Sequence, residues 1–530
     1  MSEGRTRPKT IVLAAILAVA LVAGAWVFER GTTSVKVNGT RLFSQVSAAV
    51  TREYVDTVTS GQAYQLAIDG MLSQLNDPYD AYLDADRANR LAERTSGSYA
   101  GIGLQVDVRD GSLVVVNPLP GGPGDKAGIL TGDRIAQIDG KTVTGWTPDE
   151  VQKLLRGAPG SNVRIAIQHP GAVTPVTLTL TRAAIHHSAI RRAALLQSNI
   201  GYVALSVFSD STARELTATV DSLTKLGATS LVLDLRANPG GLLEQGVAVA
   251  DLFLNRGDRV ASTAGRDSTD NHIYSDSISQ RWPELSVALL VDNKSASAAE
   301  VVAGALQDHD RAVVVGMTTY GKGSVQHIFQ VPGGGALRLT TARWLTPLGR
   351  YISGPPPSAD DNSRDSAPPR PKYHTPGGRS VLGGGGITPD VAIADTAAPA
   401  ENLALMRALG TGVSRFHDAL TGYALTLKAS HAIKSPEFVV TRPMLDEVYR
   451  GMEARSVNVP RSTYDAAAPL VSRLLAYDIA RYVFGLEAEF RRKATDDRVL
   501  IAAERLLSAS HSQADALRRA GEMQRQQIRE

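Results

Sequence analysis

The pattern of hydrophobic and polar positions changes twice along the chain. Between residues 42 and 95, apolar side chains recur every three or four positions, which is the spacing of one face of a helix. The sequence Asn76-Asp77-Pro78 interrupts this pattern, because proline breaks a helix. The segment therefore predicts a small helical region. Its recurring apolar positions are Leu42, Val46, Val50, Ala67, Ile68, Met71, Leu72 and Leu75.

From Gly101 onward the period of the pattern is two, which is typical of strands with one buried face. One helical stretch, residues 147–155, lies within this part of the chain. We expect a compact β-rich module. Its strands are expected at residues 112–116, 133–138, 163–168 and 176–181.

Beyond residue 200, short apolar strands alternate with amphipathic helices. Such alternation predicts a largely parallel sheet with helices packed on it. Strands are expected at residues 201–207, 230–235, 287–291 and 312–315, and helices at 211–226, 243–254 and 298–307.

Residues 354–372 carry two proline-rich, polar stretches and have almost nothing to bury, so they predict a disordered surface insertion. The turn sequence Thr346-Pro-Leu-Gly-Arg350 before the insertion is echoed after it by Thr375-Pro-Gly-Gly-Arg379. From Asn402 the pattern is helical to the end, and the final thirty residues are polar enough to predict fraying.

Two sets of residues in the C-terminal part have more than one interpretation. The basic run Arg491, Arg492 and Lys493 lies beside acidic residues and predicts a solvated face. The second set is apolar and consists of Leu470, Leu474, Leu475 and Ile479. It fits either an internal core or an oligomer interface, and we favour internal packing.

The N-terminal segment carries an export signal. Arg5, Arg7 and Lys9 precede the uncharged run 11–28, whose 18 residues sit at the lower limit for a membrane-spanning helix. Basic residues before such a run place the N-terminus in the cytoplasm. The sequence Ala23-Gly24-Ala25 also fits a signal-peptidase site, so anchor and cleaved signal both remain open. In either case we expect the rest of the chain outside the cytoplasm, in the periplasm.

The composition of the chain excludes some kinds of functional site. The chain has 530 residues and no cysteine, which excludes disulfides, thiolate metal sites and cysteine nucleophiles. Its 56 basic and 53 acidic residues nearly balance, so the charge gives no indication of a nucleic-acid partner. We expect no metal or organic cofactor.

A first candidate for chemistry is Ser297, in the sequence Ser295-Ala-Ser-Ala-Ala-Glu300, where a buried strand is followed by a helix. A serine there presents its hydroxyl at the carboxyl edge of the sheet, and the free amides of the helix start can receive an oxyanion. The alternative is structural, because Ser297 and Glu300 also have the spacing of a helix capping box.

Two glycine-rich segments are further candidates. The loop from Gly316 to Gln326 contains Lys322 between glycines and approaches a phosphate-binding loop, but Gly323 stands where the magnesium-binding hydroxyl is needed. A solvated lysine between turn glycines is the other interpretation. The turn Asp234-Leu-Arg-Ala-Asn-Pro-Gly-Gly241 lets the backbone expose amides to a ligand, as an oxyanion hole requires, or serves only to connect a strand to a helix.

Taken together, these three segments resemble the carboxy-terminal processing (tail-specific) serine proteases. The resemblance implies that Ser297 is the nucleophile, Lys322 its general base and Gln326 a residue that orients the lysine. It further implies an oxyanion hole made by the amides of Gly241 and Ala298. Asp308 and Gly240 match positions that support activity in the family, and Ala299 replaces a serine of the common pattern.

The same resemblance extends to neighbouring segments. Gly101, Ile102, Gly103 and Leu104 are similar to the carboxylate-binding loop of a PDZ domain, which holds the free end of a peptide while the peptide adds a strand to the sheet. Residues 386–390 match the strand that closes the catalytic core of the family. The resemblance covers residues 35–393.

The implied fold is multidomain, α/β and β. It comprises a ClpP/crotonase-like α/β protease core with an inserted PDZ domain, an N-terminal membrane helix and a C-terminal helical extension. The domain boundaries follow as 1–31 for the signal or anchor, 32–96 for the helical region, 97–183 for the PDZ domain, 184–400 for the protease core and 401–530 for the C-terminal helices.

The function implied is that of a Ser-Lys endopeptidase that cleaves exported proteins near apolar, free C-termini and is anchored at the inner membrane. His309 and His327 lie close in sequence to the motifs and offer a Ser-His arrangement instead. A non-catalytic PDZ scaffold is the alternative from another class. An adaptor or activator and assembly into a homo-oligomer remain open as partners.

Overall fold

The computed structural model describes residues 39–354, 370–393 and 398–529. This part of the chain divides into two compact units, with the boundary between Tyr82 and Leu83. The predicted signal or anchor, residues 11–28, lies outside the described residues. None of the helices in the three described ranges combines the length and hydropathy needed to span a bilayer.

The first unit contains the helices α2 (Gly39–Glu53) and α3 (Ser60–Ser73), and β1 (Ala81–Leu83) crosses the boundary. Helix α3 begins at a capping box in which the Gln62 amide donates to Thr59 Oγ1 and the Thr59 amide donates to Gln62 Oε1. Phe43 of α2 stacks on Tyr64 of α3, with ring centroids 6.0 Å apart. The predicted helical spacing and its break before Pro78 are confirmed.

The β-rich module has a sheet of order β3-β4-β5-β7-β8, with β6 paired to β5. Val115, Ile135 and Ile165 fill its core together with Val151 of the helix α6. Each predicted strand and the predicted helix are present within two residues of the expected ends. The bounds are β3 (Leu104–Arg109), β4 (Ser112–Pro118), α5 (Pro123–Lys126), β5 (Arg134–Ile138), β6 (Lys141–Thr142), α6 (Pro148–Leu155), β7 (Asn162–Gln168) and β8 (Val176–Thr181).

A short antiparallel pair, β2 (Ser98–Gly101) and β9 (Ala183–His186), stands at the start and end of the module, and α4 (Ala85–Ser96) precedes it. The chain leaves β2 at Gly101 and enters β3 at Leu104. Strand β3 is at the edge of its sheet, where its outer backbone groups can pair with another strand.

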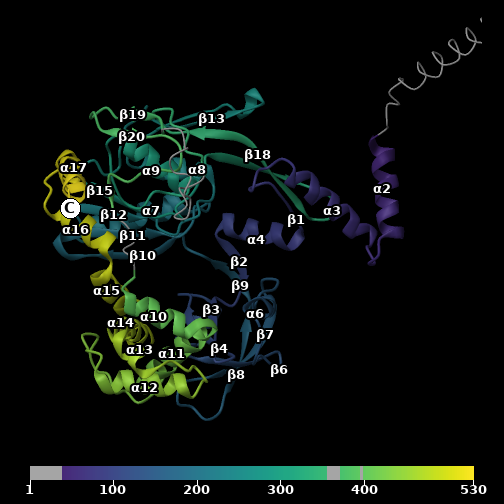
Figure 1. Cartoon of the computed structure of the whole chain (residues 1–530), viewed down its shortest axis with the longest axis vertical. Coiled ribbons are helices and arrows are strands. Elements are labelled where there is room, and N and C mark those ends of the chain that lie inside the picture. Colours follow the sequence, from purple (N-terminus) through teal and green to yellow (C-terminus); the bar gives the residue numbers. More distant parts are fainter. Residues whose placement is uncertain (1–38, 355–369, 394–397, 530) are drawn as a thin grey trace, which may run out of the picture. The chain divides into compact units, whose positions relative to one another are not determined.

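The central sheet has the order β10-β11-β12-β15-β16-β21. All neighbours are parallel except β10 and β11, which are antiparallel. The predicted strand and helix alternation is confirmed, and the order places β15 between β12 and β16. Figure 1 labels β10, β11, β12 and β15 in this order, one above the other. The bounds are β10 (Ile190–Leu195), β11 (Ile200–Leu205), α7 (Thr212–Lys225), β12 (Ser230–Asp234), α8 (Leu243–Asp251), β15 (Ser286–Val291), α9 (Ala298–Asp308), β16 (Val313–Gly316) and β21 (Val391–Ala392).

Alternate residues of these strands face two different helical layers. Leu231 and Leu233 pack with residues of α7, α8 and α9, whereas Val232 packs with residues of α16 (Arg498–Ser508) and α17 (Gln513–Arg529). The prediction that the final thirty residues fray is wrong for α17. Its alanines Ala516 and Ala520 are buried against the sheet, because side chains this small let a largely polar helix pack closely.

A second, antiparallel sheet contains four strands that the periodicity did not reveal. Strand β18 pairs with β17 on one side and with β13 on the other, and β13 also pairs with β14. Most positions of β17 and β18 are half-buried, so inward and outward residues differ too little to give a clear period of two. The bounds are β13 (Arg259–Gly265), β14 (Ile273–Ser275), β17 (Ser324–Gln330) and β18 (Ala336–Leu345).

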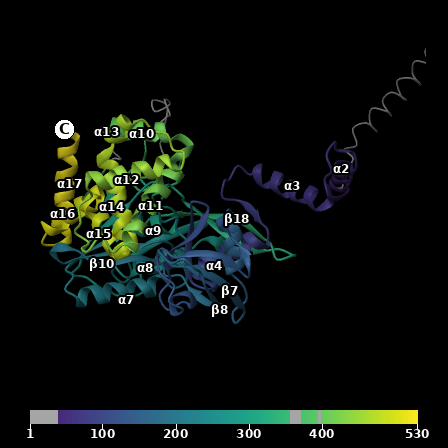
Figure 2. The same cartoon turned by 90° about the horizontal axis from the view of Figure 1, so that it is seen from below.

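The C-terminal helices α10 to α14 form their own hydrophobic cluster, whereas Phe490 and Ala494 of α15 pack against the cluster of the central sheet. Figure 2 shows these helices in green to yellow. Leu475 and Ile479 are fully buried in the cluster of α10 to α14, and Leu470 and Leu474 pack against it, which confirms internal packing of this apolar set. The bounds are α10 (Ala400–Leu409), α11 (Val413–Ala429), α12 (Arg442–Glu453), α13 (Arg461–Ala466), α14 (Ala468–Ile479) and α15 (Leu486–Asp496).

The basic run on α15 is only partly a solvated face. Arg491 pairs with the exposed Glu487, as in a solvated helix pair, whereas Lys493 pairs with the buried Glu489. Arg492 differs, since its guanidinium lies 3.9 Å from the centroid of the Phe438 ring and donates to the Pro436 carbonyl oxygen.

The predicted insertion 354–372 lies for the most part outside the described residues. Its last residues are structured: Arg370 donates to the Gly383 and Gly386 carbonyl oxygens, and Lys372 begins β19 (Lys372–His374), which pairs with β20 (Ser380–Leu382). The closing strand predicted at 386–390 is wrong in its position, because β21 is Val391–Ala392 and begins directly after that segment.

Candidate active site

Ser297 lies directly before α9, on the turn that follows β15. Its φ of 56° and ψ of −118° put a residue with a side chain in a region that is normally left to glycine, and such strain is concentrated at functional sites. Half of the predicted capping box is present, since the Ser297 amide donates to Glu300 Oε2 at 2.8 Å. The Glu300 amide donates to the Ser297 carbonyl oxygen, and the hydroxyl makes no capping bond.

The glycine turn after β12 reaches the same point. Asn238 anchors it by donating to the Leu205 carbonyl oxygen and accepting from the Gly240 amide. A Cβ on Gly240 would lie 2.7 Å from the Ser297 Cβ and 2.9 Å from the Ala298 nitrogen, so only glycine fits this approach. Gly241 and Ala298, the two residues expected to form the oxyanion hole, therefore lie next to the candidate nucleophile.

The amides of Gly241 and Ala298 are available to a ligand. Within the described residues, neither amide donates to a protein acceptor. For Ala298 this follows from its position as the first residue of α9, where an amide has no partner inside the helix. Gly241 forms a β-bridge with Phe208, but the two hydrogen bonds of this bridge do not involve the Gly241 amide. The Phe208 amide donates to the Gly240 carbonyl oxygen, and the Leu242 amide donates to the Phe208 carbonyl oxygen.

The lysine loop is tied to the serine turn by one carboxylate. Glu300 Oε1 accepts from Thr319 Oγ1 and from the Gly321 amide, both at 2.6 Å. Glu300 Oε2 accepts from the Ser297 amide at 2.8 Å and from the Lys322 amide at 2.9 Å. The backbones of the two candidate catalytic residues thus share a single oxygen atom as their acceptor.

Glu300 is fully buried. Burial raises the pKa of its carboxyl, and the hydrogen bonds from Thr319, Lys322, Gly321 and Ser297 counteract that rise. All four partners are donors, which matches the acceptor-only character of an ionised carboxylate. The sequence indicated Glu300 only as a helix cap, because its other partners lie about twenty residues further along the chain.

Lys322 and Gln326 lie on either side of the start of β17. Lys322 is half-buried, and its carbonyl oxygen accepts from Trp344 Nε1 at 3.0 Å. Gln326 donates through its side-chain amide to Ser324 Oγ at 2.7 Å and to Thr340 Oγ1 at 3.3 Å. Trp344 was not among the residues that the sequence indicated for this site. Its buried indole holds the lysine loop through the bond to the Lys322 carbonyl oxygen.

Asp308 is at the opposite end of α9 from Ser297. Eleven residues at 1.5 Å each separate the two ends by about 16 Å. Its carboxylate pairs with Arg350 at 2.5 Å and accepts from the Leu348 amide, and neither charged side chain is exposed. This geometry fits a supporting residue, because Asp308 holds the turn after β18 and is remote from the reacting serine.

One of the two candidate histidines, His309, is separated from Ser297 by the length of α9, which argues against it as the base. His309 follows Asp308 at the far end of α9, where its Nε2 lies 2.7 Å from the Arg259 carbonyl oxygen. His327 is exposed on β17 and packs beside the ring of Phe329.

The charged residues of the Asp-Leu-Arg turn have structural partners. Asp234 is buried and accepts from Tyr202 Oη at 2.6 Å and from Arg236. Arg236 also pairs with Asp497, which caps the start of α16. Burial and the adjacent Asp234 carboxylate raise the pKa of Tyr202 above its usual range, so this phenol stays neutral. The turn is thereby fastened to the C-terminal helices.

In the β-rich module, Gly101, Ile102 and Gly103 are buried and form the link between β2 and the edge strand β3. The Ile102 carbonyl oxygen accepts from the Gly124 amide, and the Gly103 carbonyl oxygen accepts from the Leu119 amide. Both carbonyl groups of this loop therefore have partners inside the module. Gly103 has a φ of 69°, a conformation that favours glycine.

Sequence models of known families match three parts of the chain. Residues 199–359 match the sequence model of Peptidase family S41, residues 114–169 that of a PDZ domain, and residues 29–87 that of the activating protease CtpB N-terminal domain. A carboxy-terminal-processing protease of Bartonella bacilliformis is 38% identical over 316 residues, which are 59% of this chain and 72% of that protein. The carboxy-terminal processing protease CtpA of Bacillus subtilis is 34% identical over 64% of this chain and 73% of its own length.

Among solved structures, the photosystem II D1 C-terminal processing protease is 30% identical and covers 71% of this chain and 98% of its own, with a TM-score of 0.35.

Proposed function

We propose, because this chain belongs to the carboxy-terminal processing serine peptidases of family S41, that it hydrolyses peptide bonds with Ser297 as nucleophile and Lys322 as general base. Gly241 and Ala298 supply the oxyanion hole, and Gln326 is a positioning residue for the lysine. The single observation that carries this proposal is the shared acceptor Glu300 Oε2, which holds the backbones of Ser297 and Lys322 together.

In the reaction that we propose, Ser297 Oγ attacks the peptide carbonyl carbon as Lys322 Nζ takes the hydroxyl proton. The carbonyl oxygen becomes an oxyanion between the amides of Gly241 and Ala298. Lys322 then passes the proton to the leaving amine, and a water molecule activated by the lysine hydrolyses the acyl-enzyme. A lysine can act as a base only from its uncharged form.

The β-rich module is a PDZ domain by its sequence match, and we propose that it recruits the free C-terminus of the substrate. Two features support this. Strand β3 is at the sheet edge, where an extended peptide can add a strand, and α6 lies beside β3. The loop Gly101 to Leu104 opens directly onto this edge, which is where the terminal carboxylate of such a peptide would lie.

We further propose that the enzyme acts on exported proteins in the periplasm, with residues 11–28 as its signal or inner-membrane anchor. The uncharged run and the basic residues before it support this location. Protease protection of the chain in intact cells tests it, since digestion only after the outer membrane is opened fits a periplasmic enzyme and digestion only after full lysis contradicts one.

The experiment that tests the catalytic roles is turnover of an unfolded protein substrate by the wild type and by Ser297→Ala and Lys322→Ala. We expect both variants to lose turnover to background while keeping the wild-type melting temperature. Lys294→Ala is the matched control, because Lys294 is an exposed lysine three residues before the serine, and this variant should retain full activity. Activity of Lys322→Ala near that of the wild type would refute the lysine as base.

A further inference from the structure

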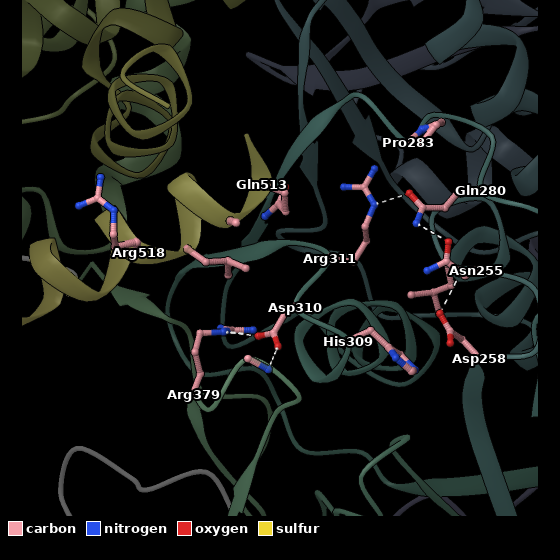
Figure 3. A pocket seen from close by; sticks show the side chains of 14 residues that line it. Asn255, Asp258, Gln280, Pro283, His309, Asp310, Arg311, Arg379, Gln513 and Arg518 are labelled. Atoms are coloured by element: carbon pink, nitrogen blue, oxygen red, sulfur yellow. Dashed lines mark hydrogen bonds and ion pairs between the residues drawn. The ribbon is translucent and has the colours of Figure 1, made fainter. Parts of the chain in front are cut away.

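A cavity of about 530 Å³ lies beyond the far end of α9, between the end of α8 and the start of α17 (Figure 3). Apolar side chains line part of it, among them Leu254, Pro283 and Leu517. Its charged lining includes Asp310 and Arg311. The cavity is separate from the candidate active site, because the length of α9, about 16 Å, lies between them.

Arg311 is the unusual residue of this cavity. Its side chain is only 7% exposed, yet within the described residues it pairs with no carboxylate. Its Nε donates to Gln280 Oε1 and to the Phe253 carbonyl oxygen, and Nη2 donates to the Trp282 carbonyl oxygen. Burial without an opposite charge lowers the pKa of Arg311 to about 10.

The remaining nitrogen, Nη1, is covered from solvent and has no acceptor in the described part of the chain. A buried donor without an acceptor is costly, and a buried cation without an anion more so. Two other cations line the cavity and both have partners, since Arg379 pairs with Asp310 and Arg518 with Asp515, while the carboxylate of Asp258 accepts from the Asn255 amide. Among the described residues, Arg311 is therefore the arginine of this cavity that has no ion-pair partner.

Gln513, the first residue of α17, supplies a second donor on the same side. Its Oε1 accepts from the Val287 amide at 2.6 Å, which fixes the orientation of the side-chain amide. Its Nε2 is buried and has no acceptor among the described residues. Figure 3 shows the Arg311 guanidinium between Gln280 and Gln513.

From these two orphan donors we infer that the cavity is a binding site for a carboxylate with a short apolar body. The carboxylate oxygens accept from Arg311 Nη1 and Gln513 Nε2, and the apolar part contacts Leu254, Pro283 and Leu517. Both nitrogens are covered from solvent, so a carboxylate reaches them only when the side chains over them move aside.

The test is a calorimetric titration of the full chain with isovalerate, together with measurement of the melting temperature in its presence. Isovaleramide has the same shape without the charge, and inorganic phosphate has charge without the apolar body. We expect saturable binding of isovalerate and a rise in melting temperature, with at least tenfold weaker binding of the other two compounds. Equal binding of isovaleramide, or no binding of isovalerate, would overturn the assignment.

A variant assigns the signal to this cavity. Gln513→Glu keeps the oxygen that accepts from Val287 and places a carboxylate beside Arg311, so it fills the site from within. We expect isovalerate binding to weaken at least tenfold in this variant while its melting temperature stays the same or rises. Wild-type binding by Gln513→Glu would show that the signal comes from elsewhere, such as the PDZ loop, and would refute the proposal.

Gln524→Glu is the matched control. Gln524 lies on the same helix and accepts from the Ala392 amide at 2.8 Å in the same manner, but it does not line the cavity. This variant carries the same added charge and should bind isovalerate like the wild type. Equal weakening in both variants would indicate a general charge effect and would contradict a site at Arg311.

Discussion

Replacement of Glu300 by glutamine tests whether one buried carboxylate holds the active site together. Each carboxylate oxygen accepts two hydrogen bonds, Oε1 from Thr319 and Gly321 and Oε2 from Ser297 and Lys322. A glutamine retains one oxygen and places an NH₂ group at the other position. That NH₂ group then faces two donors.

The less costly orientation puts the NH₂ group at the Oε1 position. The Thr319 hydroxyl can turn to accept from it, but the Gly321 amide loses its acceptor, and the bonds at the other oxygen lose their charge. Hydrogen bonds to charged groups contribute about 1.5 to 3 kcal/mol each, so one lost bond and the weakened remainder cost about 2 to 4 kcal/mol. If this cost releases the lysine loop, each 1.36 kcal/mol lowers the rate tenfold, and kcat falls about 30- to 1000-fold.

The assay is steady-state cleavage of an unfolded protein, together with thermal unfolding of the same preparations. We expect Glu300→Gln to lose activity mainly in kcat, because the groups proposed to bind the substrate tail are untouched. Glu244→Gln is the matched control, since Glu244 is an exposed acid in the first turn of the neighbouring helix α8. Activity of Glu300→Gln within threefold of the wild type would refute the argument that this carboxylate aligns the two motifs.

Two further predictions concern buried acids outside the reacting centre. Asp308→Ala leaves Arg350 buried without its partner and should lower the free energy of unfolding by about 3 to 5 kcal/mol in urea denaturation; a variant that is fully stable but inactive would instead give Asp308 a role in the chemistry. Burial, and a hydrogen bond that the protonated Asp276 carboxyl donates to Asp251, raise the pKa of Asp276 to about 7, so the folded state holds a proton that the unfolded state releases near pH 4. The stability contributed by this proton should be lost as the pH rises from 4 to 7, and Asp276→Asn should flatten the melting temperature over that range; an unchanged profile would contradict the raised pKa.

The sequence predicted those elements that are either buried at every position or buried on one face only. The strands of the central sheet are buried throughout and the helices on it are amphipathic, so both gave clear patterns. Strand β18 gave none, because six of its ten positions are half-buried and both faces meet other parts of the chain. The packing of helix α17 was not predicted, because the buried residues on the face that contacts the sheet are small alanines and the rest of its surface is polar.

The candidate site could be predicted as far as its residues lie in short motifs. The glycine turn, the serine and the lysine loop each have a local signature, and their meeting was inferred from a resemblance. The contacts that bring these motifs together connect residues far apart in the sequence. A pattern of neighbouring residues therefore does not reveal them. Asn238 to Leu205 and Trp344 to Lys322 are two such contacts.

Helix α9 explains why the two echoed turns around the insertion have the same sequence. In each turn the threonine and arginine close the same backbone bonds: Thr346 with Arg350, and Thr375 with Arg379. Arg350 then pairs with Asp308 and Arg379 with Asp310, so both turns deliver a guanidinium to carboxylates at the C-terminal end of α9.

Cations at that end of a helix complement its dipole, and here they also pair with its last carboxylates. The N-terminal end of the same helix carries Ser297 and is fixed by Glu300. A helix held at both ends cannot slide along its axis without breaking a buried ion pair or the bonds to Glu300. Since loop-closure entropy grows only slowly with length, residues added between the two turns cost the site little as long as both arginines keep their carboxylates.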